Sequence, residues 1–491
     1  MSVPSLSTFI IYLIGMLFIG FICYRLTTNL SDYVLGGRKL GGGVAALSAG
    51  ASDMSSWLLL GLPGAIFMYG MSEMWIAVGL AIGAYLNWQF VAHPLRRYTE
   101  KANDSITIPD FLENRFRDHS KILRVVSAVF ILLFFAFYTS AGLVGGARLF
   151  EASFGLPYQA ALWVGVIVII SYTFLGGFLA VSWTDFFQGI LMFAALIIVP
   201  IVAISELGGW HETVQLVGNV DSSYLNVLTD ANSIAILSML AWGLGYFGQP
   251  HIITRFMAIR HENEIPKARF IGMSWMVFSL FGAIFTGLAG IAYFTGEGPG
   301  NALADGTEET VFILFTQVLF NPWIAGFLLA AILAAIMSTI DSQLLVSSSA
   351  LAEDFYKGFL RPSAKERELV WVGRFGVLGI ALIATFLAYN PNSTILDLVG
   401  YAWAGFGAAF GPVILLSLFW WRMTRWGALA GIVIGGGTVI LWARLEGGLF
   451  ELFEIVPGFI FGMAAIVLIS LIDKKPDNDI LNEFKAVHQK N

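Results

Sequence analysis

The chain has 491 residues, of which 57% are hydrophobic and only 12% are charged, and its formal net charge is −6. The apolar residues gather into blocks of about twenty, which is long enough to cross the hydrocarbon core of a bilayer and excludes a soluble globular protein. The single cysteine, Cys23, excludes a disulfide framework and a cysteine-based metal site.

The apolar blocks predict an all-α integral membrane protein with about thirteen transmembrane helices. In chain order, the spans are expected near residues 6–26, 43–68, 72–93, 123–149, 157–175, 179–205, 233–255, 269–294, 322–349, 368–388, 394–420, 426–444 and 453–472. Only loops connect them. We therefore expect a single transmembrane domain over residues 1–473 and a short polar tail over residues 474–491.

Lysine and arginine residues alternate between successive loops. The first loop is basic, as are residues 255–269 and 357–374, whereas residues 206–232 and 296–321 contain no Lys or Arg. Of 27 basic residues, only Arg148 and Arg444 fall on the other side. The positive-inside rule then predicts an N-terminus outside the cell and a C-terminal tail in the cytoplasm.

Two spans carry residues that an ordinary lipid-facing helix would not. In the second span, residues 46–57 are mostly small or hydroxyl-bearing, with Asp53 near the middle of the bilayer. In the seventh, Gly243, Gly245 and Gly248 precede Pro250, which disfavours a continuous helix and predicts a break.

Two broken helices five spans apart are typical of a five-plus-five inverted repeat with a binding site at the midplane. The repeats would cover about residues 43–205 and about residues 233–420, with peripheral helices at 6–26, 426–444 and 453–472. Unwound backbone there exposes carbonyls to a cation, and half-helix ends can face a carboxylate. The alternative is that Gly and Pro only kink packed helices.

The ninth span places oxygen atoms on one helical face. Ala335, Ser338 and Thr339 are spaced i, i+3 and i+4, so the alanine carbonyl and two hydroxyls lie near one another. Neutral hard oxygens are the ligands that Na⁺ favours. The alternative is that both hydroxyls bond back to carbonyls of their own helix.

At several places the chain resembles the sodium/solute symporters, most closely those that carry proline. The likeness runs through residues 35–39 (LGGRK), 48–55 (SAGASDMS), 176–185 (GGFLAVSWTD), 243–251 (GLGYFGQPH) and 401–412 (YAWAGFGAAFGP). The resemblance implies Na⁺-coupled import of L-proline by alternating access in the bacterial inner membrane. Other amino acids, betaines and pantothenate are the alternative solutes. It implies no enzyme activity, cofactor, nucleic acid or obligate protein partner.

The resemblance also implies roles for individual residues. One Na⁺ would bind the carbonyls of Ala51, Met54 and Ala335 and the hydroxyls of Ser338 and Thr339, with Asp53 close by and Asp185 assisting ion passage. The solute would contact Ser55, Trp57, Tyr138, Trp242, Tyr246 and Pro250. Arg38 and Glu309 would belong to gating loops. Ser56 stands where the family pattern usually has glycine, which leaves the fine substrate preference open.

Four alternatives are weighed against Na⁺-coupled symport. Proton coupling through Asp53 is disfavoured because carbonyls and hydroxyls do not titrate near neutral pH. A channel usually takes its selectivity from a symmetric ring of subunits rather than pseudo-symmetric halves. None of the six histidines has a metal-ligand partner at i+3 or i+4, and the sequence has no Walker-type motif, which disfavours an enzyme or an ATP-driven pump.

Overall fold

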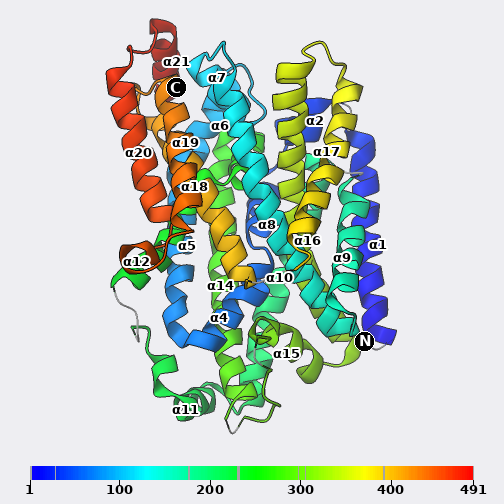
Figure 1. Ribbon diagram of the computed structural model, residues 1–491. Coiled ribbons are helices and arrows are strands. Elements are labelled where there is room, and N and C mark those ends of the chain that lie inside the picture. Colours follow the sequence, from blue (N-terminus) through cyan, green and yellow to red (C-terminus); the bar gives the residue numbers. More distant parts are fainter. Residues whose placement is uncertain are drawn as a thin grey trace.

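The computed structural model describes residues 3–27, 29–174, 177–228, 233–296, 298–304, 306–390 and 393–489. Gly176, the first residue of the 176–185 motif, lies outside this set. Over these ranges the chain is helical, and its one extended pairing joins Leu40 to Ile259. Most of the long helices run along a common direction, with the two chain termini at opposite ends of the bundle (Figure 1).

The first half of the chain forms α1 (Val3–Leu26), α2 (Leu30–Leu35), α3 (Gly42–Asp53), α4 (Leu62–Tyr69), α5 (Met74–Leu86), α6 (Ala92–Lys101), α7 (Ile108–Phe116), α8 (Ile122–Phe154), α9 (Tyr158–Thr173), α10 (Phe178–Glu206) and α11 (Trp210–Val220). The second half forms α12 (Ser233–Ala241), α13 (Pro250–Ala258), α14 (Ile265–Phe294), α15 (Val311–Leu319), α16 (Pro322–Ser349), α17 (Glu366–Leu387), α18 (Ile395–Phe419), α19 (Arg425–Trp442), α20 (Ile455–Ile472) and α21 (Asn478–His488).

Within the described residues, ten helices are long and apolar enough to cross a membrane. Two shorter apolar helices, Tyr158–Ser171 and Ser233–Gly248, accompany them. The predicted all-α membrane class is therefore confirmed, whereas the number thirteen stays a prediction.

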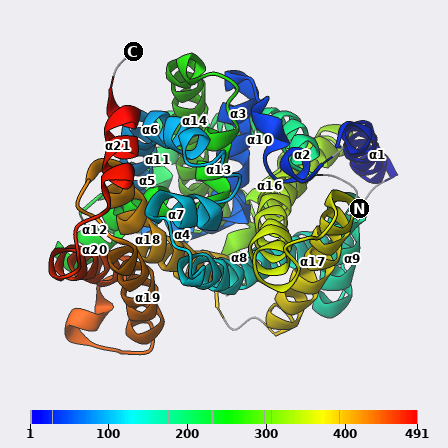
Figure 2. The same ribbon diagram turned by 90° about the horizontal axis from the view of Figure 1, so that it is seen from above.

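The core of the bundle lies around α16 and α18. In each of these helices 83% of the apolar stretch is buried, against 33% in α1 and 39% in α19. Figure 2 accordingly shows α1 at one edge of the bundle and α19 and α20 at the opposite edge. The most buried helices thus include the one that carries Ala335, Ser338 and Thr339.

The second span is interrupted between α3 and α4. The last bonds of α3 run from the Met54 amide to the Gly50 carbonyl, at 2.9 Å, and the Ser55 amide turns back to the Asp53 carbonyl, also at 2.9 Å. A wide π-helical turn, η2 (Trp57–Gly61), then leads into α4. The run of small and hydroxyl residues is therefore where regular helical geometry stops.

The seventh span is interrupted between α12 and α13. Its middle is a tight 3₁₀ segment, η6 (Trp242–Gly248), followed by extended backbone at Gln249. Pro250 starts α13, where the missing amide hydrogen costs nothing because the first turn has no intrahelical partner. The break predicted from the glycines and the proline is present.

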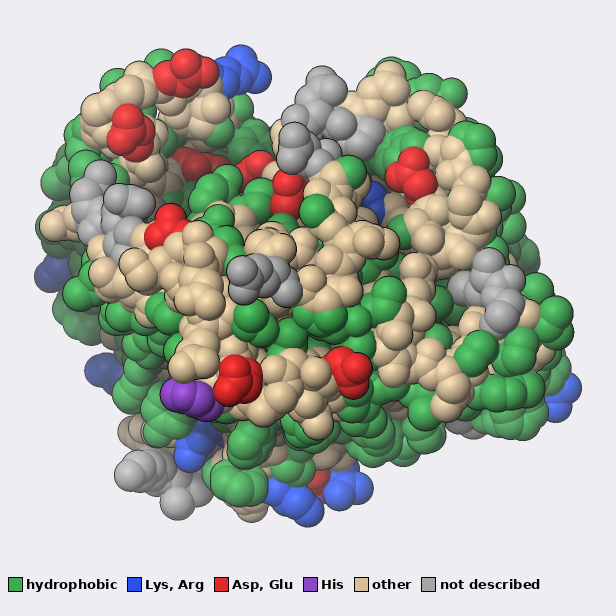
Figure 3. All heavy atoms as spheres, turned by 90° about the horizontal axis from the view of Figure 1, so that it is seen from below, with side chains coloured by type: hydrophobic (Ala, Val, Ile, Leu, Met, Phe, Trp, Pro, Cys, Tyr) green, Lys and Arg blue, Asp and Glu red, His purple; other side chains and the backbone are tan. Residues whose placement is uncertain are grey.

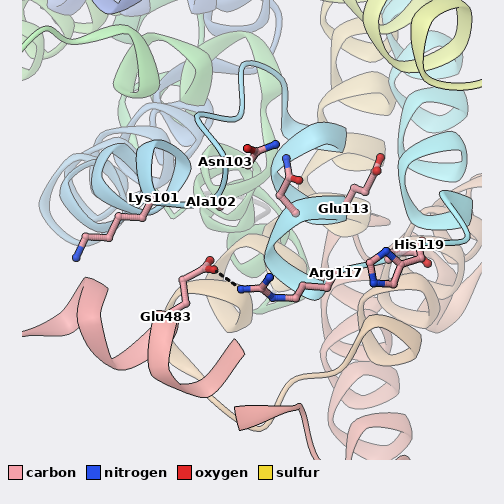
Figure 4. A pocket seen from close by; sticks show the side chains of 9 residues that line it. Lys101, Ala102, Asn103, Glu113, Arg117, His119 and Glu483 are labelled. Carbon is pink, nitrogen blue, oxygen red and sulfur yellow. Dashed lines mark hydrogen bonds and ion pairs between the residues drawn. The ribbon is translucent and has the colours of Figure 1, made fainter. Parts of the chain in front are cut away.

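The two ends of the bundle differ in charge. Figure 3 shows the end that holds α11 and α15, where acidic side chains are spread over the face and Lys and Arg lie mainly at its margin. At the opposite end, the tail contains the helix α21, which packs on α6 and α7. Glu483 of α21 pairs with Arg117 at 3.1 Å beside a cavity of about 380 Å³ (Figure 4). The polar tail predicted from the sequence thus includes a docked helix.

Candidate functional site

Four oxygen atoms gather where the interrupted α3 meets α16. The Ser338 hydroxyl donates to the Ala51 carbonyl at 2.8 Å and lies 3.1 Å from the Ala335 carbonyl. The Thr339 hydroxyl lies 3.4 Å from the same Ala51 oxygen. Met54, the fifth predicted ligand, is the first residue beyond α3 and is fully buried. Carbonyl and hydroxyl oxygens at this spacing suit a monovalent hard cation.

A side-chain contact links the two breaks. The Tyr246 hydroxyl, on η6, donates to one carboxylate oxygen of Asp53 at the end of α3. The other Asp53 oxygen accepts no hydrogen bond from the described residues. Both side chains are 3% exposed, and a buried carboxylate needs such a partner. A predicted solute residue therefore contacts a predicted ion-path residue directly.

The aromatic residues predicted for the solute site are all buried, and two of them cluster around Asp53. The Trp57 indole nitrogen donates to the Asp53 carbonyl at 3.3 Å, and Tyr246 binds the carboxylate of the same residue. Ser55, which lies between Asp53 and Trp57 in sequence, accepts from the Trp57 amide at 3.4 Å. Tyr138, on α8, lies edge-on to the His251 ring at 5.8 Å, next to Pro250.

Two cavities approach the η6 break. One, of about 560 Å³, is lined by Trp242, Tyr401 and the segment that connects α19 to α20. The other, of only about 20 Å³, is lined by Pro250 and by residues of α7 and α16. Each cavity thus touches one candidate solute residue, Trp242 at the start of the break and Pro250 just after it.

A buried ion pair lies one helical turn from the candidate cation ligands. The Arg255 guanidinium is 3.1 Å from the Asp185 carboxylate, which also accepts from Ser48 at 2.7 Å. Arg255 further donates to Ser342 at 2.5 Å and to a backbone carbonyl. Ser48 is three residues before Ala51 on α3, so Asp185 is connected to the neighbourhood of the site through that serine.

Counting Arg255 among the basic loop residues was wrong, because its side chain is fully buried. It occupies the second turn of α13, which has only just resumed after Pro250. A guanidinium is tolerated at this depth because a carboxylate and several oxygens surround it. An arginine five residues after a midplane proline is the sequence signal that could have revealed it.

The two residues assigned to gating loops lie at opposite ends of the bundle. Arg38, beside α2, donates to the carbonyls of Met257 and Ser105, each at 2.8 Å, and pairs with Asp104. Glu309 lies in the short turn η8 (Glu308–Thr310) before α15. Figure 1 shows α2 near one end and α15 at the other.

Glu309 caps the start of α18. Its carboxylate accepts from the amides of Ile395 at 2.8 Å and Leu396 at 3.4 Å, and Arg148 lies 3.8 Å away. Burial raises the pKa of the Glu309 carboxyl, against the opposite effects of Arg148 and the two amides. Negative charge at a helix N-terminus is favourable, so this contact holds the η8 loop against α18.

Three further residues near the breaks were not identified from the sequence pattern. The Trp403 indole donates to the Trp242 carbonyl at 2.7 Å, and the Asn87 amide donates to the Tyr246 carbonyl at 2.9 Å. Gln249 donates to the Trp403 carbonyl at 3.1 Å. Asn87 is a polar residue in an apolar block, so the same cost argument that selected Asp53 could have found it. Trp403 carries no such signal.

Ser56, which departs from the family pattern, is fully buried and faces α8. A side-chain carbon at Gly145 would lie only 2.6 Å from its Cβ atom. The added hydroxyl is therefore accommodated because residue 145 is glycine.

Two interrupted membrane helices, with carbonyl and hydroxyl oxygens gathered beside one break and aromatic side chains beside the other, define an ion-coupled secondary transporter. The comparisons with known proteins make this specific. The model of the sodium:solute symporter family matches residues 33–435, and the chain belongs to that family, as its motifs predicted. It is a Na⁺-coupled solute symporter and a multi-pass protein of the bacterial inner membrane.

Curated relatives agree with this family, and a solved structure shares the fold. The chain is 55% identical over 483 residues to the sodium/proline symporter of Salmonella typhimurium, covering 98% of this chain and 96% of the relative. It is 55% identical over 470 residues to the high-affinity proline transporter PutP of Bacillus subtilis, covering 96% and 98%. A Na⁺-coupled sialic acid symporter, 18% identical, has the same fold, with a TM-score of 0.82 over 97% of this chain and 99% of that one.

Proposed function

We propose that the chain imports L-proline together with Na⁺, and that the ion binds the carbonyls of Ala51, Met54 and Ala335 and the hydroxyls of Ser338 and Thr339. The observation that carries the ion site is the approach of the Ser338 and Thr339 hydroxyls to the Ala51 carbonyl. These oxygens belong to two different helices, so the ion would tie the end of α3 to α16.

Proline is the proposed solute because relatives about 55% identical over nearly the whole chain are named for it. The fold alone does not choose the solute, since the sialic acid symporter shares it. Ser55, Trp57, Tyr138, Trp242, Tyr246 and Pro250 would enclose the ring of the solute, and the half-helix ends at the breaks would face its carboxylate. Other amino acids, betaines and pantothenate are the alternatives.

Coupling between ion and solute would run through Asp53 and Tyr246. Asp53 ends the helix that contributes Ala51, and its carboxylate accepts from the hydroxyl of Tyr246. An ion that orders the end of α3 would therefore also fix a wall of the solute site. Asp185 would assist ion passage through Ser48, and Arg38 and Glu309 would act in closing the two ends.

The transport cycle would be alternating access in a thirteen-span protein with repeats at about residues 43–205 and about residues 233–420. The N-terminus would face outward and the tail inward. Chain termini at opposite ends of the bundle support an odd number of crossings (Figure 1). Few basic side chains over the middle of the face in Figure 3 support its assignment to the outside.

The ion site is tested by replacing both hydroxyls, as Ser338→Ala/Thr339→Ala. Uptake of radiolabelled proline into proteoliposomes under an imposed potential should lose its dependence on external Na⁺. We expect at least a tenfold rise in the Na⁺ concentration for half-maximal uptake, because each lost ligand costs about 1 kcal/mol or more.

Two buried serines that each donate to a carbonyl of their own helix provide the control. Ser348 and Ser349 lie on the same helix and both donate to the Leu345 carbonyl. Ser348→Ala/Ser349→Ala should leave the Na⁺ dependence unchanged. An unaltered Na⁺ dependence in Ser338→Ala/Thr339→Ala would show that these hydroxyls do not bind the ion. Wild-type uptake that follows a pH gradient without Na⁺ would show that the coupling ion is the proton.

A further inference from the structure

The 3₁₀ segment η6 and the following Gln249 are held by one residue of α18, outside their own span. The Trp403 indole nitrogen donates to the carbonyl of Trp242, at the start of the segment, at 2.7 Å. The carbonyl of Trp403 accepts from the side chain of Gln249, at its end, at 3.1 Å. A carbonyl at a break in a membrane helix loses its regular i+4 amide partner, so a side-chain donor of this kind satisfies it.

Glycines make this close contact feasible. A side-chain carbon at Gly245 would lie 1.9 Å from the indole nitrogen of Trp403, and one at Gly248 would lie 2.3 Å from the carbonyl of Phe406. On the facing helix, a carbon at Gly407 would lie 2.8 Å from the Cα atom of Gly245. The glycines that weaken the helix therefore also create the space that the indole fills.

The same indole also supports a residue of the candidate solute site. The rings of Trp403 and Tyr246 meet edge to face, with centroids 5.0 Å apart. Tyr246 in turn donates to Asp53. Trp403 is 1% exposed and lies behind η6, so it contacts both ends of the segment and one of its central side chains.

We propose that Trp403 is a positioning residue that fixes residues 242–249 in the geometry required for solute recognition, and so determines solute affinity and selectivity. This inference rests on the proposed function for the assignment of Trp242, Tyr246 and Pro250 to the solute site. Within the described residues, the hydrogen bonds of Trp403 do not include the four gathered oxygens of Ala51, Ala335, Ser338 and Thr339. Its removal should therefore affect solute binding more than ion binding.

The test compares Trp403→Phe with Trp75→Phe in the full-length protein. Both substitutions remove an indole donor from a backbone carbonyl. Trp75 donates to the Val227 carbonyl at 2.9 Å, which lies outside residues 242–249. For Trp403→Phe we expect the KM for proline to rise roughly tenfold, because one buried carbonyl loses its donor. The uptake ratio of proline to its six-membered-ring homologue pipecolate should also fall, since the loosened segment would discriminate less between ring sizes.

Two further readouts separate positioning from general damage. Na⁺ alone, compared with choline, should raise the unfolding temperature of Trp403→Phe as much as that of wild type. Amide hydrogen exchange over residues 242–249 should become faster in Trp403→Phe and stay unchanged in Trp75→Phe. The exchange measurement needs no solute, so it tests the contact even if wild type fails to take up proline, which would overturn the proposed function instead.

A second variant covers poor folding of Trp403→Phe. Gln249→Met removes the donor at the other end of the segment at similar volume, and it should reproduce the higher KM and the faster exchange. Unchanged exchange over residues 242–249, or a KM and pipecolate ratio equal to those of Trp75→Phe, would overturn the proposal. If Trp403→Phe lost both its solute affinity and the Na⁺-dependent rise in unfolding temperature, the proposal would also be overturned, because Trp403 would then support the whole fold.

Discussion

At the scale of single residues, the centre of the molecule is organised by buried charges that each have a specific partner. Asp53 accepts from Tyr246, and Asp185 is bonded to Arg255 and Ser48. Removing one member of a buried pair leaves the other uncompensated, which is far more costly than losing the pair as a whole. These residues therefore constrain both stability and transport.

The Asp185 and Arg255 pair leads to a prediction about stability. Asp185→Asn should lower the free energy of unfolding by about 3–5 kcal/mol, since it leaves a buried guanidinium without a counter-charge. Asp185→Asn/Arg255→Met should recover a large part of that loss. Thermal unfolding of the purified variants in detergent measures both effects, arranged as a double-mutant cycle.

An ion pair with one solvent-exposed partner provides the contrast. Asp104 pairs with Arg38 but is 68% exposed, so Asp104→Asn should cost less than about 1 kcal/mol. If Asp185→Asn and Asp104→Asn lowered the free energy of unfolding equally, the buried pair would contribute no more to stability than the pair with an exposed partner. Failure of the double substitution to recover stability would point to Arg255 itself, through Ser342 and the backbone, as the stabilising group.

How far the site could be predicted differs from residue to residue. Asp53, Ser338 and Thr339 are site candidates from the sequence because polar groups in an apolar span are expensive, and the spacing of Ser338 and Thr339 puts these two on one face of their helix. Arg255 was misplaced, since a loop charge and a buried cation look alike at the end of a span. Trp403 was missed because an indole in a membrane helix is ordinary, and only the close approach of α18 to η6 gives it a role.

At the scale of elements, the interrupted helices and the η8 loop are the parts to which the proposed transport cycle assigns movement. Both breaks follow from local chemistry, with glycines and proline in the seventh span and small hydroxyl residues in the second. The loop contact could not be predicted in this way. Glu309 meets the start of α18 across 86 residues of sequence, a separation at which no local pattern operates.

Glu309 leads to a prediction about pH. Because burial raises its pKa, the folded protein binds this proton more tightly than the unfolded chain does. The charged form therefore lowers stability, and the loss is recovered as the pH falls through the raised pKa. Glu309→Gln, which resembles the protonated form, should unfold at a higher temperature than wild type at neutral pH, and the two should converge at low pH.

Transport should respond in the other direction. A neutral side chain attracts Arg148 and the start of α18 less strongly, so uptake by Glu309→Gln at neutral pH should fall, by no more than about fivefold. Glu308→Gln, on the neighbouring residue of the same turn, should show neither effect. A pH dependence of unfolding that is the same in wild type and Glu309→Gln would contradict this account of the loop.

At the scale of the whole molecule, the apolar composition predicts the membrane class and the shared motifs predict the family, and both are confirmed. The docking of α21 onto α6 and α7 was not foreseen, because Lys101 and Arg117 look like ordinary cytoplasmic charges until the tail folds against them. The thirteen spans, the repeat and the orientation stay predictions. They depend on where the bilayer lies as well as on the helices.

Energetically, one ion per solute is sufficient for concentrative uptake. One positive charge moving through a potential of ~150 mV gains about 3.4 kcal/mol. That free energy supports a gradient of about 300-fold, before any gradient of Na⁺ itself is added. The central claim is therefore strict coupling of a single Na⁺ to each proline.

The most direct test of that claim is to let the solute drive the ion. Proteoliposomes with the potential clamped at zero are given an inward proline gradient, and the entry of radioactive sodium and labelled proline is followed together. The account predicts equal initial fluxes in wild type and no proline-driven sodium entry in Ser338→Ala/Thr339→Ala. Proline entry without sodium, or accompanied by acidification of the lumen instead, would contradict it.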